Sequence, residues 1–505
     1  MGLKVAVIGH IVPTPLRMVP SAMERWGYNY NRVLLEDGSM EDHLAFLKRT
    51  EGIPESQPFS VWEMYLGSGL ILQSLLRSQG AEVLLVNYID SHNEGQAFED
   101  LRLFQPDLVL LSTTFLLSPA QLQYASRTIR RHLPEVFVVA GGHHVYITLL
   151  GRTDKFKAAY LKATPLDAFI EDVQGEDSLL QFLDAFPDQL EKVPNLTWVD
   201  TGGAIRVNAR VKEHNALVGL QSFDGISPGS VVHLRTARGC AFSCAFCSYP
   251  STGGAWEYMS VEESLLAIER AIAAGAGSII FTDDTFNVPK ERFQLLLDGM
   301  IDRGLTIPWY SFFRCQFADE PLVAKMKQSG CRGVFLGIES GSDAILANIG
   351  KGAKVEHYRK GIRWLKEAGI ITVGSFLFGF PGETRETVAE TEAFIQTAGL
   401  DFYFPQLFYY LHHAPIHARA EEFKLKGSGL LWSHATMDYR EASRLLDEIY
   451  LRSEVLPVHQ DYNLWEIAFL QNKGFDLQRI KDYRRTIKSM TVRQMGGAPM
   501  TSIPG

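Results

Sequence analysis

The segment VVHLRTARGCAFSCAFC, residues 231–247, joins a short apolar run to three closely spaced cysteines. Val231–Thr236 is typical of a buried strand. Cys240, Cys244 and Cys247 follow it with the spacing C-x3-C-x2-C. Thiols this close in one loop suit a metal or an iron–sulfur cluster. Because a common four-iron site takes four cysteines, three in one loop would leave one iron open to chelate a substrate.

A zinc site with three cysteines and one histidine is the alternative interpretation of this loop. Such a site requires its fourth ligand at a close and fixed spacing. The nearest histidine, His233, lies inside the strand that precedes the loop and is poorly placed for this role. The sequence therefore favours a cluster over zinc.

The other two cysteines, Cys315 and Cys331, stand alone in the sequence. A disulfide framework would need more cysteines, spread more evenly, and two thiols are too few for a second all-cysteine cluster. An isolated cysteine usually behaves as a small buried hydrophobe. Cys315 nevertheless follows a predicted strand end, so we keep it as a candidate for a functional thiol.

Composition and charge exclude several classes of protein. The chain has 505 residues, of which 46% are hydrophobic and 21% are charged, as in ordinary globular proteins. The net charge of −9 disfavours nucleic acid and acidic membranes as partners. No run approaches the ~18 apolar residues of a membrane span, and Met1–Ala6 lacks the apolar stretch of an export signal. We expect a cytoplasmic protein without a membrane partner.

A strand–helix alternation runs outward from the cysteine loop. Six β/α repeats over residues 228–415 predict a partial TIM-like barrel, whose chemistry lies at the carboxyl ends of its strands. Residues 416–505 are predicted to be a mainly helical region that covers the substrate pocket. The predicted barrel strands are Val231–Thr236, Gly277–Thr282, Trp309–Arg314, Gly333–Glu339, Ile371–Gly379 and Tyr403–Tyr410.

The first part of the chain shows a second alternation of strands and helices. It predicts a doubly wound parallel α/β sheet of the Rossmann or flavodoxin kind over residues 1–210. A hairpin at Asn195–Asn208 closes this domain, and residues 211–227 link it to the barrel. The predicted strands are Leu3–Gly9, Glu82–Asn87, Leu108–Ser112, Val136–Gly142 and Ala168–Val173.

In its cysteine loop and strand ends the chain resembles the radical S-adenosylmethionine (SAM) superfamily, although Ala241 replaces the usual proline. The resemblance implies a [4Fe-4S] cluster on Cys240, Cys244 and Cys247, with SAM on the open iron. It also implies an external electron donor such as flavodoxin or ferredoxin. Taken alone, some of these residues have ordinary explanations, since Asp283 could cap a helix. The residues implied to contact SAM are Phe246, Asp283, Asp284, Arg314, Glu339 and Gly379.

The first domain resembles the cobalamin-binding domain that is fused to one large class of these enzymes. The resemblance rests on Phe104–Asp107, Ser112–Thr114, Ala140–His144 and Asp167–Glu176. A domain that has lost its cofactor is the alternative. Small residues at the strand ends would let a large flat ring approach the backbone. The residues implied to hold cobalamin are His10, Ser112, Thr113, Gly141, Gly142 and Gly175.

Asp90–Gly95 fits D-x-H-x-x-G, the pattern with which some cobalamin proteins ligate cobalt through histidine. In those proteins the pattern follows the first strand, whereas here it follows the second. We therefore interpret it as a surface loop, in which His92 is only a minor candidate for a cobalt ligand. His10 follows the first strand and is better placed.

The resemblance implies a cobalamin-dependent radical SAM methyltransferase that acts on an unactivated carbon of a small molecule or natural product, with a peptide as second choice. In the family's usual mechanism, a 5′-deoxyadenosyl radical removes hydrogen and methylcobalamin supplies the methyl group. The alternatives are a cyclisation, rearrangement or other redox reaction without methyl transfer, and a non-catalytic cobalamin- or zinc-binding protein. Candidates for catalysis are Tyr410, His412, His413 and Cys315.

Overall fold

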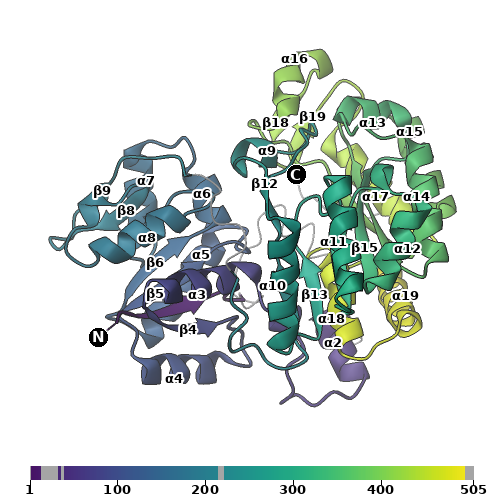
Figure 1. Cartoon of the computed structure of the whole chain (residues 1–505). Coiled ribbons are helices and arrows are strands. Elements are labelled where there is room, and N and C mark those ends of the chain that lie inside the picture. The colour runs from purple at the N-terminus through teal and green to yellow at the C-terminus, as the bar shows by residue number, and fades with distance from the viewer. Residues whose placement is uncertain (1, 13–31, 36–38, 214–220, 495–505) are drawn as a thin grey trace. The chain divides into compact units, whose positions relative to one another are not determined.

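The computed structural model describes residues 2–12, 32–35, 39–213 and 221–494 (Figure 1). Contacts divide the chain into two units. The first comprises residues 1–19, 62–226 and 253–257, and the second comprises residues 20–61, 227–252 and 258–505. The described residues between 32 and 61 thus belong with the second unit, although the sequence grouped them with the first domain.

The first unit contains a seven-stranded sheet in the order β4-β1-β5-β6-β7-β8-β9. The first five strands in this order run parallel, and the β8–β9 hairpin extends the sheet in the antiparallel sense. Because the order reverses at β1, the crevice expected for a ligand lies at the carboxyl ends of β1 and β5. The strands are β1 (Lys4–Ile8), β4 (Glu82–Val86), β5 (Leu108–Ser112), β6 (Phe137–Gly141), β7 (Ala168–Ile170), β8 (Leu196–Val199) and β9 (Ile205–Val207).

Helices cover both faces of this sheet because alternate strand residues point to opposite sides. Val5 and Val7 pack in one core with Leu75 of α3 (Gly67–Ser78) and Phe182 of α8 (Glu176–Ala185). Ala6 and Ile8 pack in the other core, against the remaining helices. This arrangement confirms the doubly wound fold. The remaining helices are α4 (Glu94–Phe104), α5 (Pro119–His132), α6 (His143–Leu149) and α7 (Asp154–Lys162).

The second unit is built on a parallel sheet in the order β10-β13-β14-β15-β16-β17-β20. The six predicted strands are present. The two-residue strand β20, which pairs with the start of β17, is a further strand that the sequence pattern missed. The strands are β10 (Val231–Leu234), β13 (Ser278–Phe281), β14 (Trp309–Phe313), β15 (Cys331–Glu339), β16 (Ile371–Phe378), β17 (Phe402–Leu407) and β20 (Leu456–Pro457).

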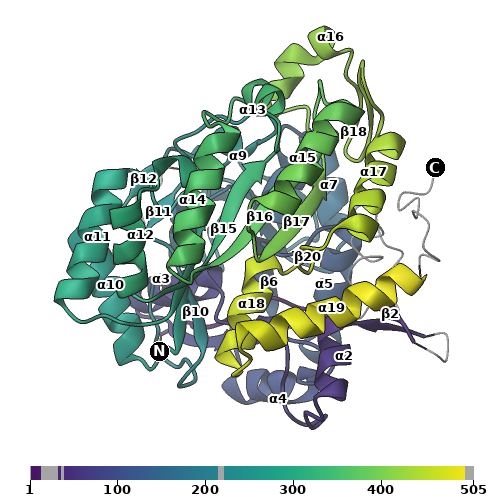
Figure 2. The ribbon, with the colours of Figure 1, turned by 90° about the vertical axis from the view of Figure 1, so that its right-hand side faces the viewer.

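Helices connect these strands and cover the outer face of the sheet, as Figure 2 shows for α14 and α15. Among the strands that the structure describes, β10 and β20 stand at opposite edges and do not pair, so the barrel is incomplete, as the sequence predicted. The connecting helices are α10 (Val261–Ala273), α11 (Lys290–Asp302), α12 (Glu320–Gln328), α13 (Asp343–Ile349), α14 (Val355–Glu367) and α15 (Arg385–Thr397).

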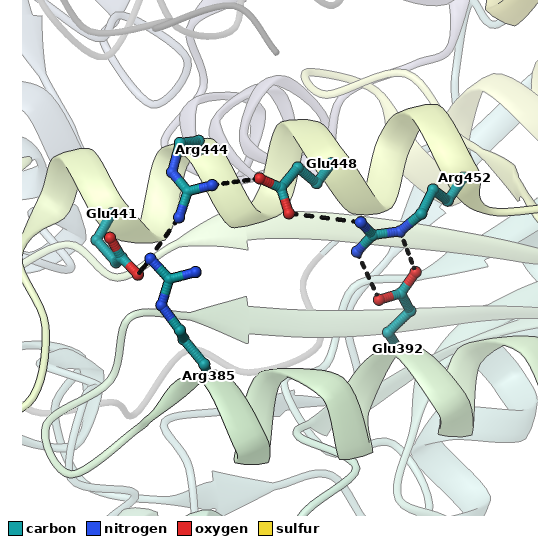
Figure 3. A network of polar contacts seen from close by, with 6 residues as sticks. All are labelled: Arg385, Glu392, Glu441, Arg444, Glu448 and Arg452. Atoms are coloured by element: carbon teal, nitrogen blue, oxygen red, sulfur yellow. Dashed lines mark hydrogen bonds and ion pairs between the residues drawn. The ribbon is translucent and has the colours of Figure 1, made fainter. Parts of the chain in front are cut away.

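The chain after β17 adds a hairpin and long helices to this unit. They are β18 (Lys426–Ser428), β19 (Leu431–Ser433), α17 (Tyr439–Arg452), α18 (Asn463–Asn472) and α19 (Leu477–Gln494). A chain of ion pairs fastens α17 to α15, with Arg452 of α17 2.9 Å from Glu392 of α15 (Figure 3). None of the helices described is long and apolar enough to cross a membrane.

A buried polar cluster ties α2 (His43–Thr50) to the last helices of the chain. The Arg484 guanidinium donates to Nδ1 of His43 at 3.2 Å and lies 3.4 Å from the Glu466 carboxylate. All three side chains are almost fully buried. A buried charge must be paired, so this cluster explains why α2 belongs with the second unit.

Candidate active site

The cysteine loop lies at the carboxyl end of β10, between β11 (Ala237–Arg238) and α9 (Tyr249–Thr252). Backbone hydrogen bonds fix its course. The Cys247 N–H donates to the Cys244 carbonyl at 3.0 Å, and the Ala245 N–H donates to the Ile349 carbonyl at 2.7 Å. The loop is therefore held both by its own turn and by the end of α13.

The three thiols fit the donor set of an open four-iron cluster. Cys244 is buried, and Cys240 and Cys247 are partly buried. Burial raises the pKa of the Cys240 thiol and raises that of Cys247 to about 11, so metal binding must displace their protons. Among the described residues, no three His, Cys, Asp or Glu side chains are grouped to hold a single metal ion. A cluster that takes one thiolate per iron does not need such convergence.

Asp283 holds the strand end that leads into the cysteine loop. Its carboxylate accepts hydrogen bonds from the Thr236 N–H at 2.6 Å, the Thr236 hydroxyl at 2.5 Å and the Ala237 N–H at 3.1 Å. Burial raises the pKa of Asp283, and the bonds from Thr236 oppose that shift. Both carboxylate oxygens of Asp283 thus accept hydrogen bonds from the protein itself, although the resemblance implied that Asp283 contacts SAM.

Asp284 has a different environment from its neighbour. Its side chain is open to solvent, yet desolvation by the surrounding protein raises its pKa to about 7, while a hydrogen bond with Tyr249 opposes the shift. The Asp284 carboxylate can therefore be reached by a ligand, although the surrounding protein partly desolvates it. Of the two neighbouring aspartates, Asp284 is therefore the one that faces outward from the strand end.

Arg314 lies against the cysteine loop from the end of β14. Its Nη2 is 3.3 Å from the Cys244 sulfur, and its guanidinium carbon is 3.5 Å from the centre of the Phe242 ring. The Asn287 side chain fixes its backbone, donating to the Arg314 carbonyl and accepting from the Arg314 N–H, each at 2.9 Å. The structure therefore brings together Arg314 and a predicted cluster ligand.

Glu339 ends β15 in a backbone conformation that is rare for a residue with a side chain, with φ of +72°. Its Oε1 accepts from the ammonium group of Lys351 at 2.8 Å, and both side chains are buried. A Cβ on Gly337 would lie 3.0 Å from each partner, so only glycine leaves the pair undisturbed. Backbone strain of this kind gathers at functional sites.

Lys351 is the site residue that the sequence did not indicate. Besides pairing with Glu339, it offers its carbonyl to Arg314 Nη1 at 3.5 Å and to Gln316 Nε2 at 3.4 Å. A lysine after the glycine that ends a helix is common on protein surfaces. No local signal therefore separates Lys351 from a solvent-exposed lysine.

Gly379 begins the turn after β16 with φ of +84°. A Cβ there would lie 2.2 Å from the Trp432 ring of β19, and His434 Nε2 lies 3.2 Å from the Gly379 carbonyl. The fully buried Glu383 accepts from the Gly379 N–H at 2.5 Å, and burial raises the pKa of Glu383 to about 8. Residues in and just after the C-terminal hairpin thus pack against the Gly379 turn, where the resemblance implied a SAM contact.

Three of the four catalytic candidates lie together after β17. The Tyr410 hydroxyl is 2.7 Å from Nδ1 of His417, and the His412 and His417 rings stack with centres 5.0 Å apart. His412, His413 and His417 are exposed, whereas Tyr410 is buried. His412 Nε2 lies 3.0 Å from the Gly427 carbonyl of β18, so the exposed histidines lie beside the C-terminal hairpin.

Cys315 lies elsewhere, packed against α14. Its sulfur is 3.0 Å from the position that a Cβ on Gly361 would occupy, and the side chain is 2% exposed. Burial raises the pKa of Cys315 to about 12. These surroundings suit a packing residue and do not support a reactive thiol.

The carboxyl edge of the first sheet carries hydroxyls and glycines. Thr113 donates its hydroxyl to the Gly141 carbonyl at 2.9 Å, and Ser112 donates to the Thr114 hydroxyl at 3.2 Å. Gly142 has φ of +110°, and a Cβ there would lie 3.2 Å from the Thr114 hydroxyl oxygen. Gly175, with φ of +74°, precedes α8 at the neighbouring strand end. These residues thus lie at or after the ends of three adjacent strands, β5, β6 and β7.

His10 lies at the end of β1 beneath aromatic rings. The centre of its ring is 4.2 Å from that of Trp62 and 6.1 Å from that of Phe115. The side chain is 2% exposed, its Nδ1 has no hydrogen-bond partner within the described chain, and burial lowers its pKa to about 3. The ring is therefore neutral, as a metal ligand must be.

His92, in the loop that fits the cobalt-binding pattern, is exposed instead. Its neighbour Asp90 accepts from the N–H groups of His92 and Asn93 at 2.9 Å and 3.1 Å, just before α4. Asp90 therefore has a structural role in this turn, and its presence in the pattern does not require a bound cobalt.

Comparison with known proteins identifies the class. Residues 234–395 match the profile of the Radical SAM superfamily. The chain is 31% identical over 343 residues to an uncharacterized methyltransferase of Pyrococcus horikoshii, a match that covers 63% of this chain and 71% of that protein. The chain belongs to the radical SAM superfamily.

Two further similarities extend the comparison. The chain is 24% identical over 321 residues to the anaerobic magnesium-protoporphyrin IX monomethyl ester cyclase of Rubrivivax gelatinosus, covering 59% of this chain and 56% of the cyclase. Its structure resembles that of the radical SAM methyltransferase TsrM from Kitasatospora setae, solved with cobalamin and a [4Fe-4S] cluster bound. That match has a TM-score of 0.56 and 20% identity, and covers 70% of this chain and 75% of TsrM. The likeness confirms the predicted fold class.

Proposed function

We propose that the protein is a cobalamin-dependent radical SAM methyltransferase that acts on a small molecule. The observation that carries the proposal is the C-x3-C-x2-C loop at the carboxyl end of the first barrel strand. It occurs in a chain that is 31% identical to an uncharacterized methyltransferase. Cys240, Cys244 and Cys247 would hold the cluster, and an electron donor such as flavodoxin or ferredoxin would reduce it.

The strand ends around the loop would bind SAM. Glu339 Oε1 is engaged by Lys351, which leaves Oε2 to accept a hydrogen bond from the ligand. Asp284 presents an accessible carboxylate, and the Gly379 turn would border the SAM site, with the Trp432 ring packed where a side chain on Gly379 would lie. Phe246 would close the site from within the cysteine loop.

The edge of the first sheet would hold cobalamin. Gly141, Gly142 and Gly175 expose backbone to a large flat ligand, while Ser112 and Thr113 offer hydroxyls. His10 remains the candidate for cobalt ligation because its ring is neutral and its Nδ1 is unpartnered in the described chain. Trp62 lies against the same ring, so ligation would require His10 to be uncovered.

When bound, the cluster and SAM supply a radical that removes hydrogen from an unactivated carbon, and cobalamin supplies the methyl group. The part of the protein would be to bind and orient these groups. Tyr410, His412 and His413 are proposed to contact the substrate, since they follow the last long barrel strand.

The proposal is tested by anaerobic incubation of the reconstituted protein with methyl-deuterated SAM and candidate small molecules. The expected result is 5′-deoxyadenosine together with a product that carries one deuterated methyl group. Formation of neither, from a preparation that contains both cofactors and a reductant, across small-molecule and peptide substrates, would contradict the assignment.

A reaction without methyl transfer is the second candidate function. The observation that favours it is the 24% identity to the magnesium-protoporphyrin cyclase. The same incubation distinguishes the two, because a cyclase or rearrangement would yield 5′-deoxyadenosine and a product without deuterium.

A further inference from the structure

The contacts of Arg314 lie inside the protein. Its side chain is 7% exposed, with Nη2 3.3 Å from the Cys244 sulfur and Nη1 3.5 Å from the Lys351 carbonyl. The Phe242 ring lies against the guanidinium plane, with its centre 3.5 Å from the guanidinium carbon. A guanidinium stacked on one side and bonded at two nitrogens has little freedom to turn toward a ligand.

Among the described residues, no carboxylate forms an ion pair with Arg314. Within the described part of the chain, its guanidinium contacts a thiol, an aromatic ring and a carbonyl. Glu339, the acidic residue at the next strand end, is paired with Lys351 instead. A full positive charge therefore lies beside Cys244, 3.3 Å from its sulfur.

Adding an electron to an iron–sulfur cluster increases its negative charge. Hydrogen bonds to the cluster sulfurs and nearby positive charge stabilise the reduced form, and both raise the reduction potential. Bonds between a charged donor and a charged acceptor are also stronger than neutral ones. An N–H donor on a cysteine ligand is thus placed to influence reduction before any SAM is bound.

We propose that Arg314 is a positioning residue that donates a hydrogen bond to the sulfur of Cys244 and thereby makes the cluster easier to reduce. This inference rests on the proposed function, because it requires the cluster. It differs from the expectation that Arg314 binds SAM. A SAM ligand acts only when SAM is present, whereas a donor to the cysteine sulfur acts without it.

The test is a redox titration of the reconstituted cluster without SAM, using dithionite as the one-electron donor and electron paramagnetic resonance as the readout. Arg314→Gln should lower the ratio of reduced to oxidised cluster at a fixed potential by about tenfold, the scale of one hydrogen bond to a charged group. Phe242→Leu, which removes the stacking surface, should lower the ratio less. Arg314→Lys, which keeps the charge, should fall between Arg314→Gln and the wild type.

Two controls separate this role from others. Arg363→Gln removes an exposed arginine from the neighbouring helix α14 and should leave the potential unchanged. Glu339→Gln should weaken SAM binding and serves as the reference for a lost SAM contact. If Arg314→Gln fails to assemble a cluster, the redox titration of Arg314→Lys and Phe242→Leu without SAM tests whether Arg314 raises the reduction potential.

The inference is overturned if the Arg314 and Phe242 variants titrate like the wild type without SAM while Arg314→Gln loses SAM affinity. That outcome would make Arg314 a SAM ligand and leave the proposed function intact. Failure of the wild type to assemble a cluster would instead contradict the proposed function itself.

Discussion

The carboxyl edges of the two parallel sheets differ in the chemistry they present. At the second sheet, the predicted contacts include charged side chains such as Arg314 and Glu339, the latter in a buried pair with Lys351. At the first sheet, the predicted contacts are glycines, hydroxyls and the neutral His10. Charged groups suit a small zwitterion such as SAM, whereas small residues suit a large flat cofactor. Similar topologies thus favour different ligands through the residues at their strand ends.

The largest expected effect is at the cysteine loop. Cys244→Ala should abolish cluster assembly, because it removes one of three thiolate ligands. Iron content and visible absorption after anaerobic reconstitution measure the loss. Cys331→Ala is the matched control, since Cys331 is buried at the start of β15, and it should retain the full iron content. Equal iron in both variants would contradict the cluster assignment.

The next effect is at the edge of the first sheet. Gly142→Ala places a Cβ 3.2 Å from the Thr114 hydroxyl oxygen at a φ of +110°. It should cost about 2–3 kcal/mol of unfolding free energy and reduce cobalamin binding at least about tenfold, because the ring loses its approach to the backbone. Denaturant unfolding and binding of hydroxocobalamin are the measurements.

Gly151→Ala separates backbone strain from lost space. Gly151 has φ of +68°, and nothing lies within 4 Å of the position that a Cβ would occupy there. It should lose about 1 kcal/mol and keep cobalamin binding. Loss of cobalamin in both variants would mean that general destabilisation, rather than the strand edge, is responsible.

A smaller effect concerns pH and Glu383. The pKa of Glu383 is about 8 in the folded protein and 4.5 ordinarily. Between these values the folded state holds a proton that the unfolded state has lost, so stability falls as pH rises. Glu383→Gln should remove this fall, so the stability of the variant relative to the wild type should be greater at pH 8.5 than at pH 4.5. Denaturant unfolding at both pH values tests this, and parallel pH profiles would refute it.

The smallest effect is expected at the ion pairs between α15 and α17. Arg452→Gln breaks contacts with Glu392 and Glu448 (Figure 3). Because these groups are partly exposed, the loss should be at most about 1 kcal/mol and should shrink in high salt. Thermal unfolding at two salt concentrations measures it. A larger, salt-independent loss would indicate that the arginine stem, not its charge, holds the helices together.

The sequence predicts those parts of the fold and site that depend on local pattern. Buried strands and the cysteine spacing are both local, so the two sheets and the loop could be anticipated. Lys351 could not, because its pairing with Glu339 depends on how two strand ends and a helix meet. The packing of the Trp432 ring against Gly379 likewise joins residues that are far apart in the sequence. The two-residue strand β20 is too short to produce an alternating pattern.

We propose that one chain holds an iron–sulfur cluster and cobalamin at two separate strand edges. Metal analysis of the reconstituted wild-type protein and its variants tests it most directly. We expect about four irons and about one cobalt per chain, with Cys244→Ala losing iron alone and Gly142→Ala losing cobalt alone. Zinc in place of iron, or absence of cobalt from the wild type, would contradict it.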